Sequence, residues 1–532
     1  MTKGDSSHLA EDIPEALAKY GEPIHVIEGP LMQAMERIGQ LFGEGKMFLP
    51  QVVRSAQVMK DAVAILTDLP QPSLKGREVS PFKGESEGVY PCVVLATANG
   101  DVHDIGKNIV SIVLSCNGFE VIDLGVMVPC ETILEATRQH KPMLVGISGL
   151  ITPSLKEMEK LCETFQREHL QVPILVGGAT TSAVHTAVKL APLYDGLVLY
   201  GGDASQTSVL AKRLDSPHFI EQIKTEQQQI RDAWSEHHAP LTPYHEANRR
   251  GEKVKRLKGE KVKENGSNSD SSLFTFHFSL KDLKEFIDWR MFLLFWGFKG
   301  ETLPQLLVNS EAEKTLREGK DFLESCIQRD SLRVEALYKE EPAIGRGNDI
   351  VLCEDGQLLP MLRSQTAAHH YHCLSDFFDE QQPSPIGMFV VTARPKTEPA
   401  DEEERLMTHA LCARLAEAAA EWLGERVKSD SSLFTLHSSL LRVAFGYATC
   451  PDHSLKRIVF DRLEAEQRLG ITLTDHYSIQ PSTSVCGLFI NHPEATYFPV
   501  GRIDREQLAD YCQRRGISIK EGEQLLSKFI SS

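Results

Sequence analysis

The chain has 532 residues, enough for three or four domains at roughly 100 to 200 residues each, and its 41% hydrophobic content suffices for each to bury a core. With 57 Lys and Arg against 74 Asp and Glu, the net charge of −17 argues against a nucleic-acid-binding protein, because phosphate neutralisation needs a basic surface. No apolar run approaches the roughly 20 residues of a membrane span, and no signal peptide is recognisable at the start, so we expect a soluble, cytoplasmic protein. The 11 cysteines include no CxxC pair and indicate neither a disulfide framework nor a thiolate zinc site.

Helical periodicity dominates the N-terminal region, after a lead over residues 1–14 that we expect to be disordered. Two sets of apolar residues recur at intervals of three and four, as on one face of a helix. A turn at Gly43–Lys46 separates them, which predicts an antiparallel helical pair, and Pro70–Gly88 is predicted to be a flexible linker. The two apolar faces are Leu31, Met35, Ile38 and Phe42, then Val52, Ala56, Met59 and Val63.

From Tyr90 the pattern changes to short apolar runs that alternate with helical stretches. This alternation predicts right-handed βαβ crossovers and a doubly wound parallel sheet of the flavodoxin or Rossmann type. Such a fold binds its ligand beyond the carboxyl ends of its strands. The five predicted strands are Cys92–Ala96, Val121–Leu124, Leu144–Ile147, Ile174–Val176 and Leu197–Tyr200.

The rest of the chain mixes helices and short strands, such as a helix over Leu406–Val427 and a strand over Gly387–Val391, and is predicted to be one α+β domain. Before it, the basic run Arg249–Lys263 is interpreted as a solvated linker, with docking of an acidic partner as the alternative. The fold class is therefore multidomain α/β. We expect N-terminal helices over 1–70, a linker over 71–89, the parallel sheet over 90–215, a second linker over 216–270 and the α+β domain over 271–532.

One polar motif stands where the first predicted strand ends. Asp101 and His103 occur in the sequence DVHDIG, before a helix expected to begin near Gly106. An imidazole at this sheet edge can bind a metal through one nitrogen while the carboxylate two residues earlier holds the other N–H. Taken alone, the Asp-x-His triplet is better explained as an aspartate that caps a turn beside a surface histidine than as a metal site, because such triplets are common.

Two further motifs follow the third and fourth predicted strands on the same sheet edge. They are Ser148-Gly-Leu150 and Gly177-Gly178, and together with DxHxxG they resemble the signature of cobalamin-binding proteins in which a histidine replaces the cofactor's dimethylbenzimidazole. The resemblance implies that His103 is the lower axial ligand of cobalt, Asp101 its hydrogen-bond partner and Ser154 the next member of the relay. It also implies that the cofactor and its nucleotide tail are contacted by Gly106, Ser148, Leu150, Thr152, Gly177 and Gly178.

Taken as a whole, the first half of the chain resembles the cobalamin-dependent methionine synthase family. In that family a helical cap covers the upper face of the corrin, and by this match Phe42 and Leu49 cover the methyl ligand. Without the resemblance, both would be ordinary core residues of a helical bundle. The matching segments are VIEGPLM, LFGEGKMFLPQVV, DVHDIGKNIV, DLGVMVP, SGLITPSL and GGATTS.

The C-terminal domain resembles the activation domain of the same family, which binds S-adenosylmethionine; the matching segments are Phe286–Trp289 and Arg442–His453. This ligand carries an ammonium, a sulfonium and a carboxylate, which are best bound by carboxylates and a bidentate guanidinium. The resemblance implies that Asp288 and Glu425 face the cationic groups of the ligand and that Arg442 binds its carboxylate. It also implies that Ala444 contributes a backbone contact and that Tyr497 stacks nearby. Without the resemblance, Arg442 would be interpreted as a surface residue and Asp288 as a charged residue on a helix.

The resemblance also implies a function. In this family cobalamin takes a methyl group from methyltetrahydrofolate and passes it to homocysteine, and S-adenosylmethionine with an electron from a flavoprotein restores the cofactor after oxidation. We therefore expect a methyltransferase that uses methylcobalamin and S-adenosylmethionine, with an electron donor of the flavodoxin or methionine synthase reductase type. The homocysteine- and methyltetrahydrofolate-binding modules have no counterpart in the sequence and are expected in the same or another chain.

Two alternatives are a stand-alone corrinoid carrier for another methyltransferase system and a regulatory cobalamin sensor. A carrier has no use for residues 271–532, and the charge disfavours the DNA-binding domain that a sensor would carry. Neither alternative accounts for Asp288, Arg442 and Tyr497 together.

Overall fold

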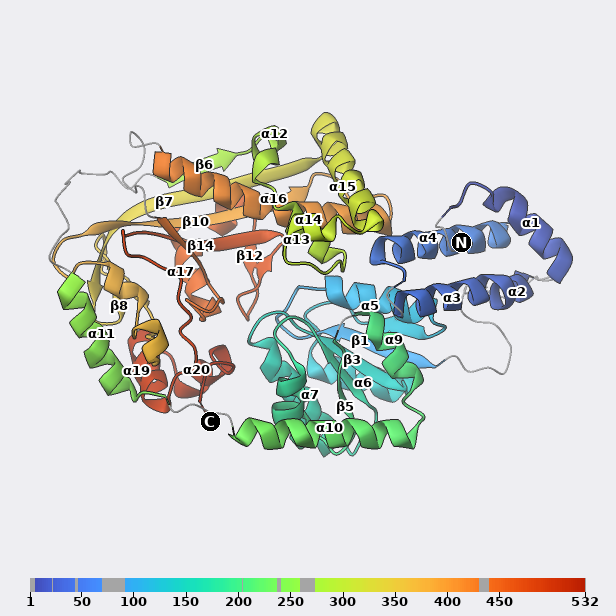
Figure 1. Cartoon of the computed structure of the whole chain (residues 1–532), viewed down its shortest axis with the longest axis horizontal. Coiled ribbons are helices and arrows are strands. Elements are labelled where there is room, and N and C mark those ends of the chain that lie inside the picture. Colours follow the sequence, from blue (N-terminus) through green and yellow to red (C-terminus); the bar gives the residue numbers. More distant parts are fainter. Residues whose placement is uncertain are drawn as a thin grey trace.

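A computed structural model describes residues 5–21, 23–43, 46–68, 91–202, 204–236, 241–258, 273–429 and 440–531. Figure 1 shows three regions: an N-terminal helical region (5–68), a parallel-sheet domain (91–236) and a C-terminal domain with an antiparallel sheet (241–531). The predicted linker 71–89 lies outside the described residues. Within the ranges described, no helix is both long and apolar enough to cross a membrane.

The N-terminal helical region is larger than the predicted helical pair. Its first helix starts inside the segment expected to be disordered, because Leu9 and Ile13 form an apolar stripe that is buried in the core of this region. The expectation of a disordered lead is therefore wrong from Leu9 onward. The helices are α1 (Leu9–Tyr20), the short α2 (Pro23–Val26), α3 (Met32–Gly43) and α4 (Leu49–Asp68), the last two being the predicted pair.

The parallel-sheet domain has five parallel strands in the order β2-β1-β3-β4-β5, which confirms the predicted doubly wound sheet. Successive residues of a strand face opposite sides, so Val93 and Leu95 pack beneath α5, α9 and α10, whereas Val94 and Ala96 pack against α6 and α7. The strands are β1 (Cys92–Thr97), β2 (Glu120–Asp123), β3 (Leu144–Ser148), β4 (Ile174–Gly177) and β5 (Val198–Tyr200). The helices are α5 (Ile105–Cys116), α6 (Cys130–His140), α7 (Ser154–Arg167), α8 (Ala183–His185), α9 (Ala204–Lys212) and α10 (Pro217–Glu236).

The predicted second linker, 216–270, instead contains α10 and α11 (Tyr244–Lys258) among its described residues. Helix α10 lies along the parallel sheet (Figure 1), whereas α11 packs on the C-terminal domain, where Tyr244 Oη donates to Asp510 Oδ2 at 2.7 Å. The linker interpretation of the basic run is therefore wrong for Arg249 to Lys258, because Lys, Arg and Glu are good helix formers. The rest of that run lies outside the described residues.

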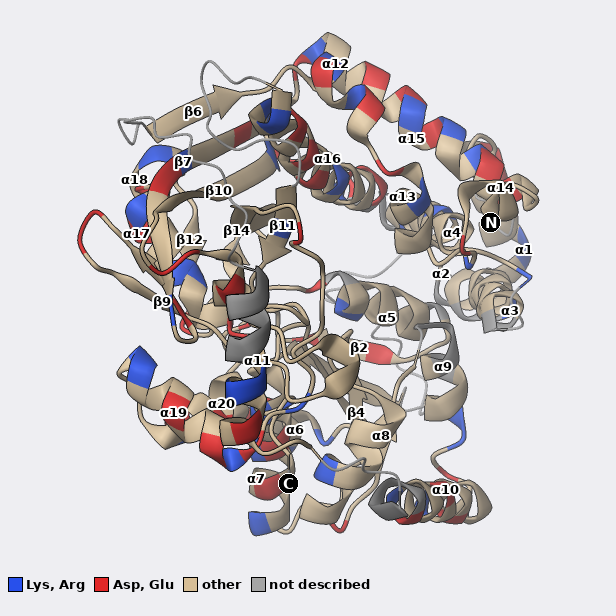
Figure 2. Cartoon of the chain, turned by 60° about the vertical axis from the view of Figure 1, so that its left-hand side comes forward, with Lys and Arg blue, Asp and Glu red and all other residues tan. Residues whose placement is uncertain are grey.

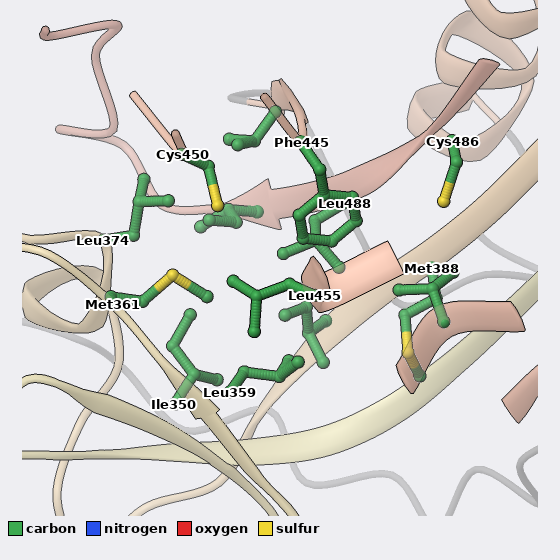
Figure 3. Close-up of a cluster of buried hydrophobic side chains, with 14 of the residues drawn as sticks. Ile350, Leu359, Met361, Leu374, Met388, Phe445, Cys450, Leu455, Cys486 and Leu488 are labelled. Atoms are coloured by element: carbon green, nitrogen blue, oxygen red, sulfur yellow. The ribbon is translucent and has the colours of Figure 1, made fainter. Parts of the chain in front are cut away.

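The C-terminal domain is α+β, as predicted. Its seven-stranded antiparallel sheet has the order β11-β14-β10-β7-β8-β9, with β6 beside β7. Helix α16 covers one face; the opposite face packs on a buried cluster that includes Met388, Leu455 and Leu488 (Figure 3). The strands are β6 (Leu273–His277), β7 (Leu332–Arg346), β8 (Asp349–Leu352), β9 (Leu358–Pro360), β10 (Ser384–Pro395), β11 (Leu440–Ala444) and β14 (Ser484–Asn491), with β12 (Thr472–Leu473) and β13 (Ile479–Gln480) in a separate pair.

The helices of this domain include the predicted one over Leu406–Val427, which is part of α16 (Glu402–Ser429). On the solvent side of the domain, α15 carries acidic and basic side chains in alternation (Figure 2), as expected for a helix that buries only one face. The other helices are α12 (Leu280–Leu283), α13 (Trp289–Phe295), α14 (Leu303–Leu306), α15 (Ser310–Arg329), α17 (Lys456–Arg462), α18 (Ala465–Leu469), α19 (Arg505–Arg515) and α20 (Ile519–Leu525).

The C-terminal domain lies against the loop that follows β1. Thr474 Oγ1 donates to the carbonyl oxygen of Gly100 at 2.7 Å. Gly100 has a positive φ of 75°, and a Cβ there would lie 2.3 Å from the ring of His476, so the close approach requires glycine. The loop that carries Asp101 and His103 therefore faces the C-terminal domain.

Candidate functional site

A hydrogen-bonded array occupies the loop between β1 and α5. His103 Nδ1 and Asp101 Oδ1 are 2.7 Å apart, and the Ser154 hydroxyl, at the start of α7, donates to Asp101 Oδ2 at 2.7 Å. The backbone N–H of Leu150 donates to the same Oδ2 at 2.6 Å. Because Nδ1 faces the carboxylate, Nε2 is the imidazole nitrogen that remains for a metal.

Asp101 is fully buried, whereas a quarter of the His103 side chain is exposed. Burial alone would raise the pKa of the Asp101 carboxyl, but the hydrogen bonds from His103, Ser154 and the Leu150 N–H outweigh it and hold the pKa below its ordinary value. The Asp101 carboxylate thus fixes the orientation of the partly exposed His103 imidazole. This is the arrangement that orients a metal-binding histidine.

A cavity of about 740 Å³ lies beside the carboxyl ends of β1, β3 and β4. Ser148, Gly177 and Gly178 line it from the sheet and Gly106 from α5, and Phe42 and Leu49 line it from the N-terminal helical region. Its volume lies within the range for sites that hold small-molecule cofactors.

Three glycines beside this cavity differ in their surroundings. Gly178 has φ +109°, and a Cβ there would lie 1.9 Å from the carbonyl oxygen of Gly149, so only glycine fits. At Gly177 and Gly106 a Cβ would meet nothing within 4 Å among the described residues. At these two positions the missing side chains leave open space in the cavity that a ligand can occupy.

A second cavity, of about 320 Å³, lies between the two domains. His103 and Leu150 line it from the parallel-sheet domain, and Arg442, Ala444 and Tyr497 line it from the C-terminal domain. Arg442 Nη2 lies 2.9 Å from Glu417 Oε2 of α16, which forms an ion pair at the wall of this cavity. The predicted axial histidine and three of the residues predicted to bind S-adenosylmethionine therefore face one space.

Three predicted residues lie apart from these cavities. Asp288 caps α13, where its Oδ1 accepts a hydrogen bond from Met291 N at 3.1 Å. Glu425 pairs with Lys428 one turn further along α16, at 2.8 Å. Thr152 is buried but lines neither cavity. The structure does not bring Asp288 or Glu425 to the wall formed by Arg442, and their ligand roles stay predictions.

Three family models match the chain in succession. Models described as B12 binding domains match residues 1–67 and 91–207, and the model described as the activation domain of vitamin B12 dependent methionine synthase matches residues 279–516. The three matched regions correspond to cobalamin-binding domains and to the activation domain of vitamin B12-dependent methionine synthase, that is, to the C-terminal part of that enzyme. The cofactors of these domains are cobalamin and S-adenosylmethionine.

Similar solved structures include parts of methionine synthase and of other corrinoid systems. The MetH reactivation domain bound to AdoHcy is 25% identical, with a TM-score of 0.47 over 55% of this chain and 100% of that chain. The methanol:cobalamin methyltransferase complex MtaBC of Methanosarcina barkeri is 26% identical, with a TM-score of 0.35 over 42% and 80%. A cobalamin-binding protein of Desulfitobacterium hafniense DCB-2 is 25% identical, with a TM-score of 0.30 over 40% and 94%.

The parallel-sheet domain of this chain fits cobalamin in its chemistry. A carboxylate-oriented imidazole and a large cavity bordered by glycines lie at the same sheet edge. Cobalamin needs both, a nitrogen ligand for cobalt and room for its nucleotide tail.

Several polar residues at the two cavities were not predicted from the sequence. Glu417 lies two helical turns before Glu425, and only the register of α16 against β11 brings it to Arg442. Lys456 and His453 line the cavity between the domains and lie 2.9 Å apart, and burial lowers the pKa of Lys456 to about 8. Lys107 is buried at the wall of the large cavity and pairs with Asp123. Of these, only the CxxH spacing that places His453 near Cys450 is visible in the sequence, and it fits no complete metal site.

Proposed function

We propose that this chain carries cobalamin between methyltetrahydrofolate and homocysteine in methionine synthesis, and that its activation domain restores the cofactor with S-adenosylmethionine and an electron. The observation that carries the proposal is the hydrogen-bonded array of His103, Asp101 and Ser154 at the same edge of the parallel sheet that borders the large cavity. Bound cobalamin supplies a cobalt centre that accepts and donates a methyl group.

The residues of the parallel-sheet domain have distinct roles in this proposal. His103 Nε2 would bind the cobalt of the cofactor, and the Asp101 carboxylate holds the proton on Nδ1. The Ser154 hydroxyl and the Leu150 N–H hold Asp101 in place. Gly106, Ser148, Gly177 and Gly178 leave room for the nucleotide tail.

Residues of the activation domain position S-adenosylmethionine, the methyl donor. Arg442 binds the donor's carboxylate, Ala444 contributes a backbone contact and Tyr497 stacks beside it. Glu417 is nearer to this space than Asp288 or Glu425, and we propose that it attracts the ligand's cationic groups. A flavoprotein supplies the electron, and homocysteine- and methyltetrahydrofolate-binding modules complete the enzyme in the cytoplasm.

The axial-ligand role is tested by loading the chain with methylcobalamin and comparing His103→Gly with His140→Gly. His140 is an exposed residue at the end of α6 and serves as the matched control. We expect His103→Gly to change the visible spectrum and weaken binding, because the cobalt loses its nitrogen ligand, while the control matches the unchanged chain. An unchanged spectrum and affinity in His103→Gly would remove the proposal.

The reactivation role is tested separately by methyl transfer from S-adenosylmethionine to cobalamin on this chain under reducing conditions. The proposal predicts transfer that Arg442→Ala diminishes. Absence of transfer would favour a plain corrinoid carrier.

A further inference from the structure

A third cavity lies at one end of the antiparallel sheet of the activation domain. The start of β7 and the ends of β6 and β10, which run side by side (Figure 1), form this cavity. Its volume is about 570 Å³, within the range for sites that hold small molecules. None of its lining residues borders either cavity described above, so the sites proposed for cobalamin and S-adenosylmethionine do not account for it.

Two arginines stand directly opposite each other at this end of the sheet. Arg333 of β7 is the cross-strand partner of Arg394 of β10, so both side chains are on the same face. Like charges in such a pair destabilise a sheet. Lys396, two residues after Arg394, adds a further cation, and all three side chains line the third cavity.

A single buried carboxylate orients the two arginines. Glu335 of β7 is 1% exposed, and its Oε1 accepts a hydrogen bond from Arg333 Nη2 at 2.7 Å. Its Oε2 lies 3.3 Å from Arg394 Nη2, and its Oε1 also lies 3.0 Å from His277 Nδ1. Because Glu335 is shared among these groups, it fixes the positions of both guanidinium groups and balances the charge of only one.

The cavity therefore has an excess of positive charge and of hydrogen-bond donors. Within the described ranges, Arg333 has no acceptor other than Glu335, so most of its N–H groups have no protein partner. Lys396 Nζ is 2.6 Å from Asp330 Oδ2, but the Asp330 side chain is 82% exposed, and such surface pairs are weak. Two carboxylates thus face three permanent cations around one concave space.

We propose that the third cavity binds a phosphorylated small molecule, whose phosphate oxygens accept hydrogen bonds from Arg333, Arg394 and Lys396. Guanidinium groups match phosphate oxygens in geometry, and a phosphate monoester carries nearly two negative charges at pH 7, which suits several converging cations. Phe278 and Val334 also line the cavity and give the organic part of such a ligand an apolar surface. Neither cobalamin nor S-adenosylmethionine is needed for this inference.

The test is calorimetric titration of the full chain with pyrophosphate at constant ionic strength, because added salt alone screens exposed charges. Arg333→Gln removes one cation of the cavity. Arg138→Gln is the matched control, since Arg138 of α6 is similarly exposed, pairs with the single carboxylate of Glu168 and does not line the cavity. We expect about tenfold weaker binding in Arg333→Gln, on the scale of a hydrogen bond to a charged group, and unchanged binding in Arg138→Gln.

Chemical labelling of lysines in the unchanged chain is a second measurement, which decides if Arg333→Gln fails to fold. Pyrophosphate is expected to slow acylation of Lys396 and not of Lys284, which pairs with Glu324 and does not line the cavity.

Three results would overturn the inference. They are the absence of pyrophosphate binding, equal affinity in Arg333→Gln and Arg138→Gln, and unchanged labelling of Lys396. Tighter binding of tricarballylate, which carries three carboxylates, than of pyrophosphate would overturn the assignment to a phosphate ligand.

Discussion

The two ligand-facing walls of this molecule are built differently. In the parallel-sheet domain, three motifs follow three strands and reach one edge because parallel strands end together. In the activation domain, Asp288, Glu425, Arg442 and Tyr497 come from separate elements, and only the last two share a cavity. Motifs at the ends of parallel strands therefore predict a site more directly than residues spread over an antiparallel domain.

The largest effect is expected from substitution of the glycines in the parallel-sheet wall. Gly178→Ala places a Cβ 1.9 Å from the Gly149 carbonyl at φ +109°, so we expect it to lower the free energy of unfolding by about 3 kcal/mol or more. Gly177→Ala meets only open space and is expected to leave the stability of the cofactor-free chain unchanged while weakening cobalamin binding. Thermal unfolding and cobalamin titration check the pair. Equal destabilisation by both variants would contradict this account of the wall.

The activation-domain wall is tested by binding of S-adenosylmethionine. Arg442→Ala removes the guanidinium and leaves Glu417 without its ion pair, so we expect about tenfold weaker binding, on the scale of a hydrogen bond to a charged group. Glu425→Gln changes a carboxylate that pairs with Lys428 away from the cavity, and we expect less than a twofold effect. Calorimetric titration measures both. A larger loss of affinity in Glu425→Gln than in Arg442→Ala would contradict this account of the wall. It would instead support the prediction that Glu425 contacts the bound ligand.

The smallest expected effect concerns pH and the contact between the two walls. His409 of α16 stacks on Phe295, and burial lowers its pKa to about 4; Asp104 opposes this shift, whereas His103, Arg405 and Arg414 add to it. Docking therefore favours the neutral imidazole and loses stability as the pH falls from about 6.5, the ordinary pKa of histidine, towards 4. Limited proteolysis at pH 7.5 and 5 is expected to show a more accessible interface at the lower pH.

The control for this pH effect is His409→Gln, which has no imidazole to protonate and should show a weaker pH dependence. The same dependence in the variant would assign the effect to other groups.

Much of this arrangement was predictable from the sequence, for reasons that the two walls make clear. The strands and the DxHxxG, SxL and GG motifs have local signals, so the doubly wound sheet and the placement of Asp101, His103 and Gly177 at one edge followed directly. The pairing of Glu417 with Arg442 depends on the register of α16 against β11, which no local pattern encodes. The helix that begins at Leu9 was missed because its apolar stripe is short and becomes buried only against the rest of the helical region.

Ligation of cobalt by His103 is the central claim, and electron paramagnetic resonance tests it most directly. The chain is produced with nitrogen-15-labelled histidine, loaded with cobalamin and reduced to the cobalt(II) state. A nitrogen-14 ligand splits the cobalt lines into triplets and a nitrogen-15 ligand into doublets. The account predicts doublets that His103→Gly abolishes. Persistent triplets in the labelled chain would show that the cofactor keeps its own dimethylbenzimidazole, and would contradict the account.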